Sequence, residues 1–199
     1  MADSVELLLI RHLPTAGNGL RKYVGWTDEP IVPVQITRSL GQPDIVYGSD
    51  LIRARQTAEL LFPEARYHPD ARFRESNFGE FEGKTYAQLE TNRAYRQWVE
   101  DPRTVSPPGG ESLQQVEKRV TEAFLELPPG TWVVTHGGPI RLLLARFAPE
   151  PRSFWDWDVP HGSCHRLRWH SSDAWKEGER CTSYSAEKRT ANDSLSGNS

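Results

Sequence analysis

The stretch Val5-Glu-Leu-Leu-Leu-Ile10 is an almost continuous apolar run, and Arg11-His12 follows it at once. A second apolar run, Trp132-Val-Val-Thr135, ends in His136-Gly-Gly. Runs of this length and composition predict short strands buried on both faces, as in a parallel sheet between helix layers. Ligand sites of open α/β sheets lie outside the carboxyl ends of the strands. The sequence therefore predicts one site that contains Arg11, His12 and His136.

Helical segments alternate with the predicted strands. Residues 43–48 favour another short strand, and a helix with one apolar face begins at Ser49 and stops at Pro63. Thr85 with Gln88 forms a capping box for a helix that we expect to end at Asp101-Pro102. The remaining predicted helices begin at Ser112, in a capping box with Gln115, and near Pro139. This alternation predicts a three-layer α/β/α sandwich with a mostly parallel central sheet.

The composition changes along the chain. Residues 1–170 fit one domain with a sizeable core. Residues 171–199 are rich in Ser, Glu, Lys, Asn and Gly without apolar periodicity, so they predict a disordered tail. Residues 159–169 alternate like an edge strand, whereas residues 31–41, interrupted by Pro33, are too short for a long helix.

Charge and composition exclude several classes of partner. The 199-residue chain has a formal net charge of −3 and a pI near 6.1, which argues against a nucleic-acid partner. Its N-terminal apolar stretch is too short for a signal-peptide core or a membrane span. Only Cys164 and Cys181 are present, which fits a reducing compartment rather than a disulfide framework. We therefore expect a cytoplasmic protein that does not act at a membrane.

The residues at the predicted site suit phosphoryl transfer. A transferring phosphoryl group is negatively charged, and arginine can bind two of its oxygens at once, so Arg11 and Arg53 are candidate donors. A deprotonated imidazole nitrogen can attack phosphorus, which suits His12, while His136 opens a glycine turn whose amides can hold an anion. Glu75, in a loop-like stretch, is the candidate acid for the leaving group. Three nearby glutamates are alternatives for that acid: Glu80, Glu82 and Glu111.

Short motifs accompany these residues along the chain. In order they are Arg11-His12-x-x-Thr15-x-x-Asn18, Gly25-Trp26-Thr27-Asp28, Ser49-Asp50-Leu51-x-Arg53-Ala54-x-Gln56-Thr57-Ala58, Glu75-x-x-Phe78-Gly79-x-x-Glu82-Gly83, Gly109-Gly110-Glu111-Ser112 and Thr135-His136-Gly137-Gly138. This set and its order resemble the histidine phosphatases, also called the phosphoglycerate-mutase-like superfamily. The resemblance covers most of residues 5–145.

The resemblance implies a role for each matching residue. His12 would carry the phosphoryl group as phosphohistidine, and Glu75 would protonate the leaving group and then deprotonate the attacking water. The family uses no metal or other cofactor for this chemistry, so we expect none, and the expected partner is a small-molecule phosphate ester. The residues that would bind the phosphate oxygens are Arg11, Arg53, His136, Asn18, Thr15 and Gly137.

Some features depart from the family or have other interpretations. Leu13-Pro14 stands where the family usually has Gly-Glu, so the loop after His12 loses one amide donor and a supporting glutamate. The sequence His161-x-x-Cys164-His165 has the residue types of a metal site. Strand alternation would turn Cys164 and His165 to opposite faces, so we expect no metal there. Trp155 and Trp157 either line a pocket or pack against the sheet.

The phosphatase branch of the family fits this chain best, because mutases usually carry longer insertions that close over the site. Within that branch the pattern resembles α-ribazole phosphatases, which makes α-ribazole 5'-phosphate a candidate substrate. A phosphoglycerate-type mutase that uses the same residues is one alternative. A non-catalytic scaffold that binds a phosphorylated ligand is another, and the Leu13-Pro14 departure motivates it.

Overall fold

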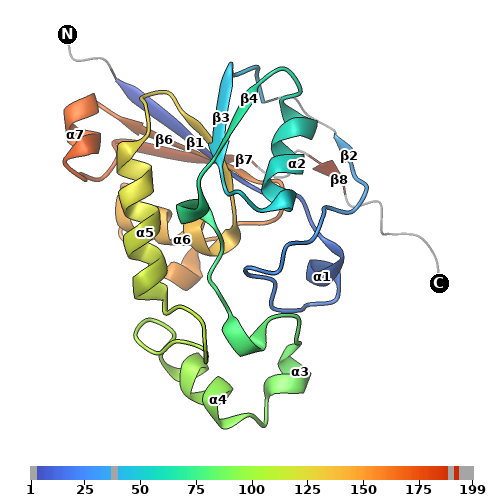
Figure 1. Ribbon diagram of the computed structural model, residues 1–199. Helices are drawn as coiled ribbons and strands as arrows, with labels where there is room; N and C mark the ends of the chain where they lie inside the picture. The colour runs from blue at the N-terminus through green and yellow to red at the C-terminus, as the bar shows by residue number, and fades with distance from the viewer. Residues whose placement is uncertain (1–3, 37–39, 188–190, 193–199) are drawn as a thin grey trace.

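A central six-stranded sheet organises the molecule (Figure 1), in the order β4-β3-β5-β1-β6-β7. The computed structural model describes residues 4–36, 40–187 and 191–192. The parallel strands are β1 (Val5–Arg11), β3 (Ile45–Gly48), β4 (Arg66–Pro69) and β5 (Trp132–Thr135). β6 (Cys164–Trp169) and β7 (Ser183–Glu187) each run antiparallel to their neighbours. The predicted α/β fold with a mostly parallel central sheet is confirmed.

Helices cover both faces of this sheet (Figure 1). Leu7 and Leu9 of β1 belong to the apolar cluster on one face, and Leu8 and Ile10 to the cluster on the other. Every position in the middle of β1 is therefore buried, which explains its unbroken apolar run. The first face is covered by α5 (Leu113–Glu126), α6 (Gly137–Phe147) and α7 (Ser172–Lys176), and the second by α2 (Ile52–Leu61).

Short helices between β4 and α5 form a separate small layer at the bottom of Figure 1. Phe81, Leu89 and Tyr95 are the buried centre of its apolar cluster. The single helix predicted from the Thr85 capping box is wrong, because Asn92 starts a second helix by accepting a hydrogen bond from the Tyr95 amide. The elements of this layer are η2 (Gly79–Phe81), α3 (Tyr86–Leu89) and α4 (Arg93–Glu100). The preceding η1 (Ala71–Phe73) packs against α5 instead, with Phe73 in the main apolar cluster.

The predicted disordered tail, residues 171–199, is wrong over residues 171–187. These residues form α7 and β7, and Trp175 at 0% exposure packs into the main apolar cluster. One large aromatic residue, with Ala174 and Cys181, buries enough surface to anchor a segment whose remaining residues are mostly polar. Residues 188–190 and 193–199 of the predicted tail lie outside the described residues.

One further expectation about the C-terminal strands is wrong. β6 is not an edge strand, because it lies between β1 and β7. In the region of residues 31–41, β2 (Gln35–Ile36) pairs with β8 (Ala191–Asn192). Across the described ranges, no helix is long and apolar enough to cross a membrane.

Candidate active site

His12 follows β1 directly and is 3% exposed. Its Nδ1 donates a hydrogen bond to the Leu13 carbonyl at 2.7 Å, which leaves the lone pair on Nε2. Burial, and then the positive charge of Arg53, holds the pKa of His12 well below its usual value. The imidazole is therefore neutral at physiological pH, with a free nitrogen lone pair.

The unusual Leu13-Pro14 pair keeps the loop after His12 in place. Leu13 is fully buried, and its amide donates to Oγ1 of Thr57 at 2.9 Å. The Pro14 carbonyl accepts from the Val32 amide at 2.9 Å. Proline restricts Leu13 to extended backbone, and the Leu13 carbonyl is the acceptor that selects the tautomer of His12. The departure from the family therefore leaves the His12 ring oriented.

Arg53 and His136 are both fully buried and form a pair next to His12. Nε of Arg53 donates to Nδ1 of His136 at 3.2 Å, while its terminal nitrogens donate to the carbonyls of Thr27 at 2.8 Å and Gly25 at 2.5 Å. The His136 ring centroid lies 4.9 Å from that of His12. This arrangement puts the proton of His136 on Nε2, because Nδ1 is occupied as an acceptor.

Arg11 completes the cluster from the end of β1. It donates to the Val159 carbonyl at 2.6 Å, and burial lowers its pKa to about 10, so it stays charged at neutral pH. Within the part of the chain that the structure describes, Arg11 Nε and His136 Nε2 are buried without a hydrogen-bond partner. Buried N–H groups left unpaired are costly, and donors from these two side chains suit an anion such as phosphate.

Glu75 lies against the N-terminus of α6. Its carboxylate accepts from the Ser76 amide at 2.9 Å and from the Gly138 amide at 3.0 Å. A Cβ on Gly138 would overlap Oε1 of Glu75, and a Cβ on Gly137 would lie 3.2 Å from Cζ of Arg11. The two glycines therefore allow Glu75 and Arg11 to approach the start of the helix. Gly137, predicted as a phosphate contact, lies beside the predicted donors.

The alternative glutamates hold the loops together. Glu82 accepts hydrogen bonds from the amides of Gly25, Trp26, Thr27 and Phe78. Glu111 pairs with Arg119 at 2.8 Å, and Arg119 also donates to the Glu75 carbonyl. These carboxylates are occupied in positioning the backbone on either side of Glu75, while Glu80 is exposed. The geometry favours Glu75 as the acid.

Thr15 and Asn18 lie in the loop after His12 and cap α1 (Ala16–Gly19). The Asn18 side chain accepts from the amide and hydroxyl of Thr15, at 3.1 Å and 2.9 Å, and the Thr15 hydroxyl also bonds Glu29. These contacts fix the shape of the loop. The phosphate contacts predicted for Thr15 and Asn18 remain predictions.

His161 belongs to this cluster, a role that the sequence did not indicate. Its Nδ1 donates to the His12 carbonyl at 3.1 Å, and its Nε2 accepts from Arg11 at 3.1 Å. Its ring centroid is 5.0 Å from that of His12. His161 thus joins the backbone of His12 to the side chain of Arg11. It lies 149 residues from His12, so no local pattern could have found this contact.

The residues of the considered metal motif have other partners. His165 bonds the Ser163 hydroxyl and the Tyr184 hydroxyl, each at 2.9 Å, while Cys164 packs in the cluster on the α2 face. No group of three or more His, Cys, Asp or Glu side chains among the described residues is placed to hold a metal ion.

An apolar cavity of about 370 Å³ opens beside Glu75 and Gly138. Trp155 is 68% exposed and lines this cavity, whereas Trp157 is buried and packs against Tyr184. Of the two roles considered from the sequence, Trp155 therefore has that of lining a pocket, and Trp157 has that of packing in the interior. The aromatic side chains of the wall are Tyr23, Phe78, Tyr86, Tyr95, Trp98, Phe154 and Trp155.

Comparison with known proteins identifies the family of this chain. The model of the histidine phosphatase superfamily (branch 1) matches residues 7–179. A probable phosphoglycerate mutase of Salmonella paratyphi C is 33% identical over 165 residues, covering 74% of this chain and 76% of the relative. Phosphoglycerate mutase-like protein 4 of Arabidopsis thaliana is 30% identical over 170 residues, covering 75% and 74%.

Solved structures are similar over most of the chain. The α-ribazole phosphatase of Shigella flexneri superposes with a TM-score of 0.71 at 25% identity, covering 84% of this chain and 92% of that one. A putative α-ribazole-5'-P phosphatase from Escherichia coli gives a TM-score of 0.73 at 22% identity, covering 93% and 95%, and shows the shared fold. With the family match over residues 7–179, these findings show that the chain belongs to the histidine phosphatase superfamily, branch 1.

Proposed function

We propose that this protein is a metal-independent phosphomonoesterase that hydrolyses a small-molecule phosphate ester through a phosphohistidine at His12. One observation carries the proposal. Two buried donors without partners among the described residues, Arg11 Nε and His136 Nε2, accompany a neutral His12 whose Nε2 holds the lone pair. The donors suit an anion, and the lone pair suits attack on its phosphorus.

In the first step Nε2 of His12 attacks phosphorus in line with the ester oxygen. The N–P bond forms as the bond from phosphorus to the leaving oxygen breaks. Arg11, Arg53 and His136 stabilise the negative charge on the equatorial oxygens. Glu75, in its protonated form, gives its proton to the leaving oxygen.

In the second step water attacks the phosphohistidine from the side that the leaving group has vacated. Glu75, now a carboxylate, takes the proton of the water as the new P–O bond forms and the N–P bond breaks. Inorganic phosphate leaves, and His12 and Glu75 return to their starting protonation states. The donors of this site are cationic or N–H groups, so neither step requires a metal ion to neutralise charge.

The apolar cavity beside Glu75 is suited to bind a leaving group that has a flat apolar part. Aromatic walls favour stacking with a planar group, and the base of α-ribazole 5'-phosphate is of that kind. The relatives from Shigella flexneri and Escherichia coli are named for that substrate. We propose it as the first natural substrate to test. Turnover no faster than that of simple sugar phosphates would contradict this assignment.

The first experiment is the hydrolysis of p-nitrophenyl phosphate in excess EDTA by the wild type, His12→Ala and His170→Ala. His170 is exposed beyond β6 and controls for the loss of a histidine. We expect turnover by the wild type and His170→Ala and none by His12→Ala. Equal turnover by all three would mean a contaminant or another nucleophile.

A second readout separates the alternatives. Rapidly quenched wild type should carry a phosphoryl group on His12, located by mass spectrometry. Isomerisation of phosphoglycerate without phosphate release, followed by ³¹P NMR, would favour the mutase named among the relatives. Binding of inorganic phosphate without any turnover would favour the scaffold.

A further inference from the structure

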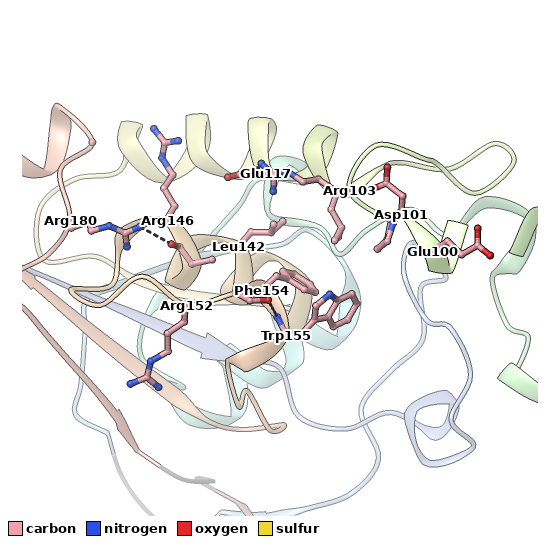
Figure 2. Close-up of a pocket in the computed structure, with 15 residues that line it drawn as sticks. Glu100, Asp101, Arg103, Glu117, Leu142, Arg146, Arg152, Phe154, Trp155 and Arg180 are labelled. Atoms are coloured by element: carbon pink, nitrogen blue, oxygen red, sulfur yellow. Dashed lines mark hydrogen bonds and ion pairs between the residues drawn. The ribbon is translucent and has the colours of Figure 1, made fainter. Parts of the chain in front are cut away.

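A second, larger groove of about 770 Å³ lies next to the apolar cavity beside Glu75, and its lining residues are drawn in Figure 2. The two share Pro102, Leu113, Phe154 and Trp155 as walls. Trp155 and Phe154 lie where they meet, and Leu142 of α6 lines the groove beyond them (Figure 2). A leaving group longer than the first cavity would reach the groove by passing the exposed side chain of Trp155.

Charge is unevenly distributed along this groove. Two of its carboxylates, from Glu100 and Asp101, lie at one end in Figure 2, whereas Glu117 lies nearer the middle and pairs with Arg103 at 3.0 Å. The other end, which we call the arginine end, is formed by Arg146, Arg152 and Arg180. These arginines come from α6, the loop after it and the loop after α7.

Among the described residues, Arg146 and Arg180 form no ion pair, whereas Arg152 pairs with a glutamate and lines a neighbouring hollow together with Asp156 and Asp158. Arg180 donates to the carbonyls of Ala145 and Ala148, at 3.2 Å and 2.7 Å, as the C-terminal end of α6 favours. Arg146 lies over the ring of Phe147 at 5.3 Å. Arg152 pairs with Glu150 at 3.0 Å, but the Glu150 side chain is 76% exposed, so this pair is strongly solvated. The arginine end therefore has a net positive charge.

We propose that the arginine end binds a second anionic group carried by the leaving group of the substrate. This inference rests on the proposed phosphatase function. It specifies the substrate class as a phosphate monoester with an apolar part, which fills the aromatic cavity, and a phosphate or other anion beyond it. Arginine is suited to this contact because its planar fork matches phosphate oxygens.

The test compares 1,ω-alkanediol bisphosphates with n-alkyl phosphates of the same length, in a series from butane to dodecane. We expect kcat/KM for the bisphosphate to exceed that of the alkyl phosphate about fivefold at one range of lengths, since exposed charge pairs contribute little each. A bisphosphate has two equivalent phosphate groups, which alone would double kcat/KM, so the expected fivefold advantage exceeds this statistical factor. The advantage should decrease as salt is added, because exposed charges are screened.

Variants of this protein test which residues cause the faster hydrolysis of the bisphosphate. The double variant Arg146→Ala/Arg152→Ala should bring the bisphosphate-to-alkyl ratio down to the statistical factor of two. Arg66→Ala, an exposed arginine on β4, is the matched control and should keep the wild-type ratio. The ratio compares two substrates on one protein, so a partly unfolded variant does not change it.

Three outcomes would overturn the inference, and they are distinguishable. If the ratio is two at every length and alkyl phosphates are still hydrolysed, the arginine end does not bind a second anion, but the phosphatase proposal is unaffected. Absence of any phosphate release, with no phosphorylation of His12, would remove both. An advantage that survives in the double variant would place the second anion elsewhere.

Discussion

Nε of Arg53 donates to Nδ1 of His136 across 3.2 Å, and both side chains are completely buried. The contact orients the imidazole, fixes its proton on Nε2 and keeps a guanidinium next to His12. Arg53 thus contributes a positive charge to the site and determines which nitrogen of His136 can donate. Because Arg53 also bonds the Thr27 and Gly25 carbonyls, it joins α2 to the loop over the site.

Replacing Arg53 tests this relationship. We expect Arg53→Ala to lower kcat on the order of 10²–10³-fold, as for loss of one preorganised donor. Arg53→Lys should rescue little, because an ammonium group cannot reach His136 and two carbonyls together. Arg55→Ala, from an exposed position on the same helix, is the control. Steady-state kinetics with p-nitrophenyl phosphate measure the effect, and equal losses in the Arg53 and Arg55 variants would contradict it.

His161 should act as a positioning residue for Arg11. His161→Ala removes the acceptor of the Arg11 hydrogen bond, so we expect inhibition by inorganic phosphate to weaken about tenfold, as for one hydrogen bond to a charged group. His161→Gln retains a donor and an acceptor and should recover part of the inhibition. His170→Ala should match the wild type. Unchanged phosphate inhibition in His161→Ala would show that Arg11 needs no such support.

Buried histidines make the stability of the fold depend on pH. Burial lowers the pKa of His165 to about 4, and it holds those of His12 and His136 well below 6.5. A histidine with a lowered folded pKa binds its proton more readily in the unfolded chain, so stability is full above pH 6.5 and decreases as pH falls toward 4.

From His165 alone we expect a loss of about 2 kcal/mol between pH 7 and pH 5, and urea unfolding at the two values measures it. In His165→Gln the difference between pH 7 and pH 5 should be smaller. A wild-type free energy of unfolding that does not change over this range would contradict the assignment of neutral buried histidines.

The sequence predicted the fold and most of the cluster because both depend on local patterns. The apolar residues of β1 and β5 and the Ser112 capping box can be recognised within a few residues, and strand ends determine which side chains meet. The remaining features depend on contacts between distant residues. Trp175 anchors α7 against the main core, and His161 contacts His12 across 149 positions, so composition and spacing could not show either.

Gly138 should be necessary at the start of α6. An alanine methyl group there would overlap the Glu75 carboxylate, so we expect Gly138→Ala to displace Glu75 and lower kcat on the order of 10²-fold. Gly19→Ala is the matched control, since a Cβ at that position meets nothing within 4 Å. Comparable activity of the two variants would mean that the helix start can shift without affecting Glu75.

Glu75→Gln separates proton transfer from the rest of catalysis. An alkoxide is a poor leaving group and needs the proton of Glu75, whereas p-nitrophenolate leaves without it. We expect the variant to lose on the order of 10²–10⁴-fold in kcat/KM on alkyl phosphates and much less on p-nitrophenyl phosphate. Glutamine keeps the size of the side chain and an oxygen that can accept from the Gly138 amide, so the approach to α6 is preserved. If both substrates lose the same factor, Glu75 holds the structure of the site, and the acid has to be sought among other groups that face the cavity.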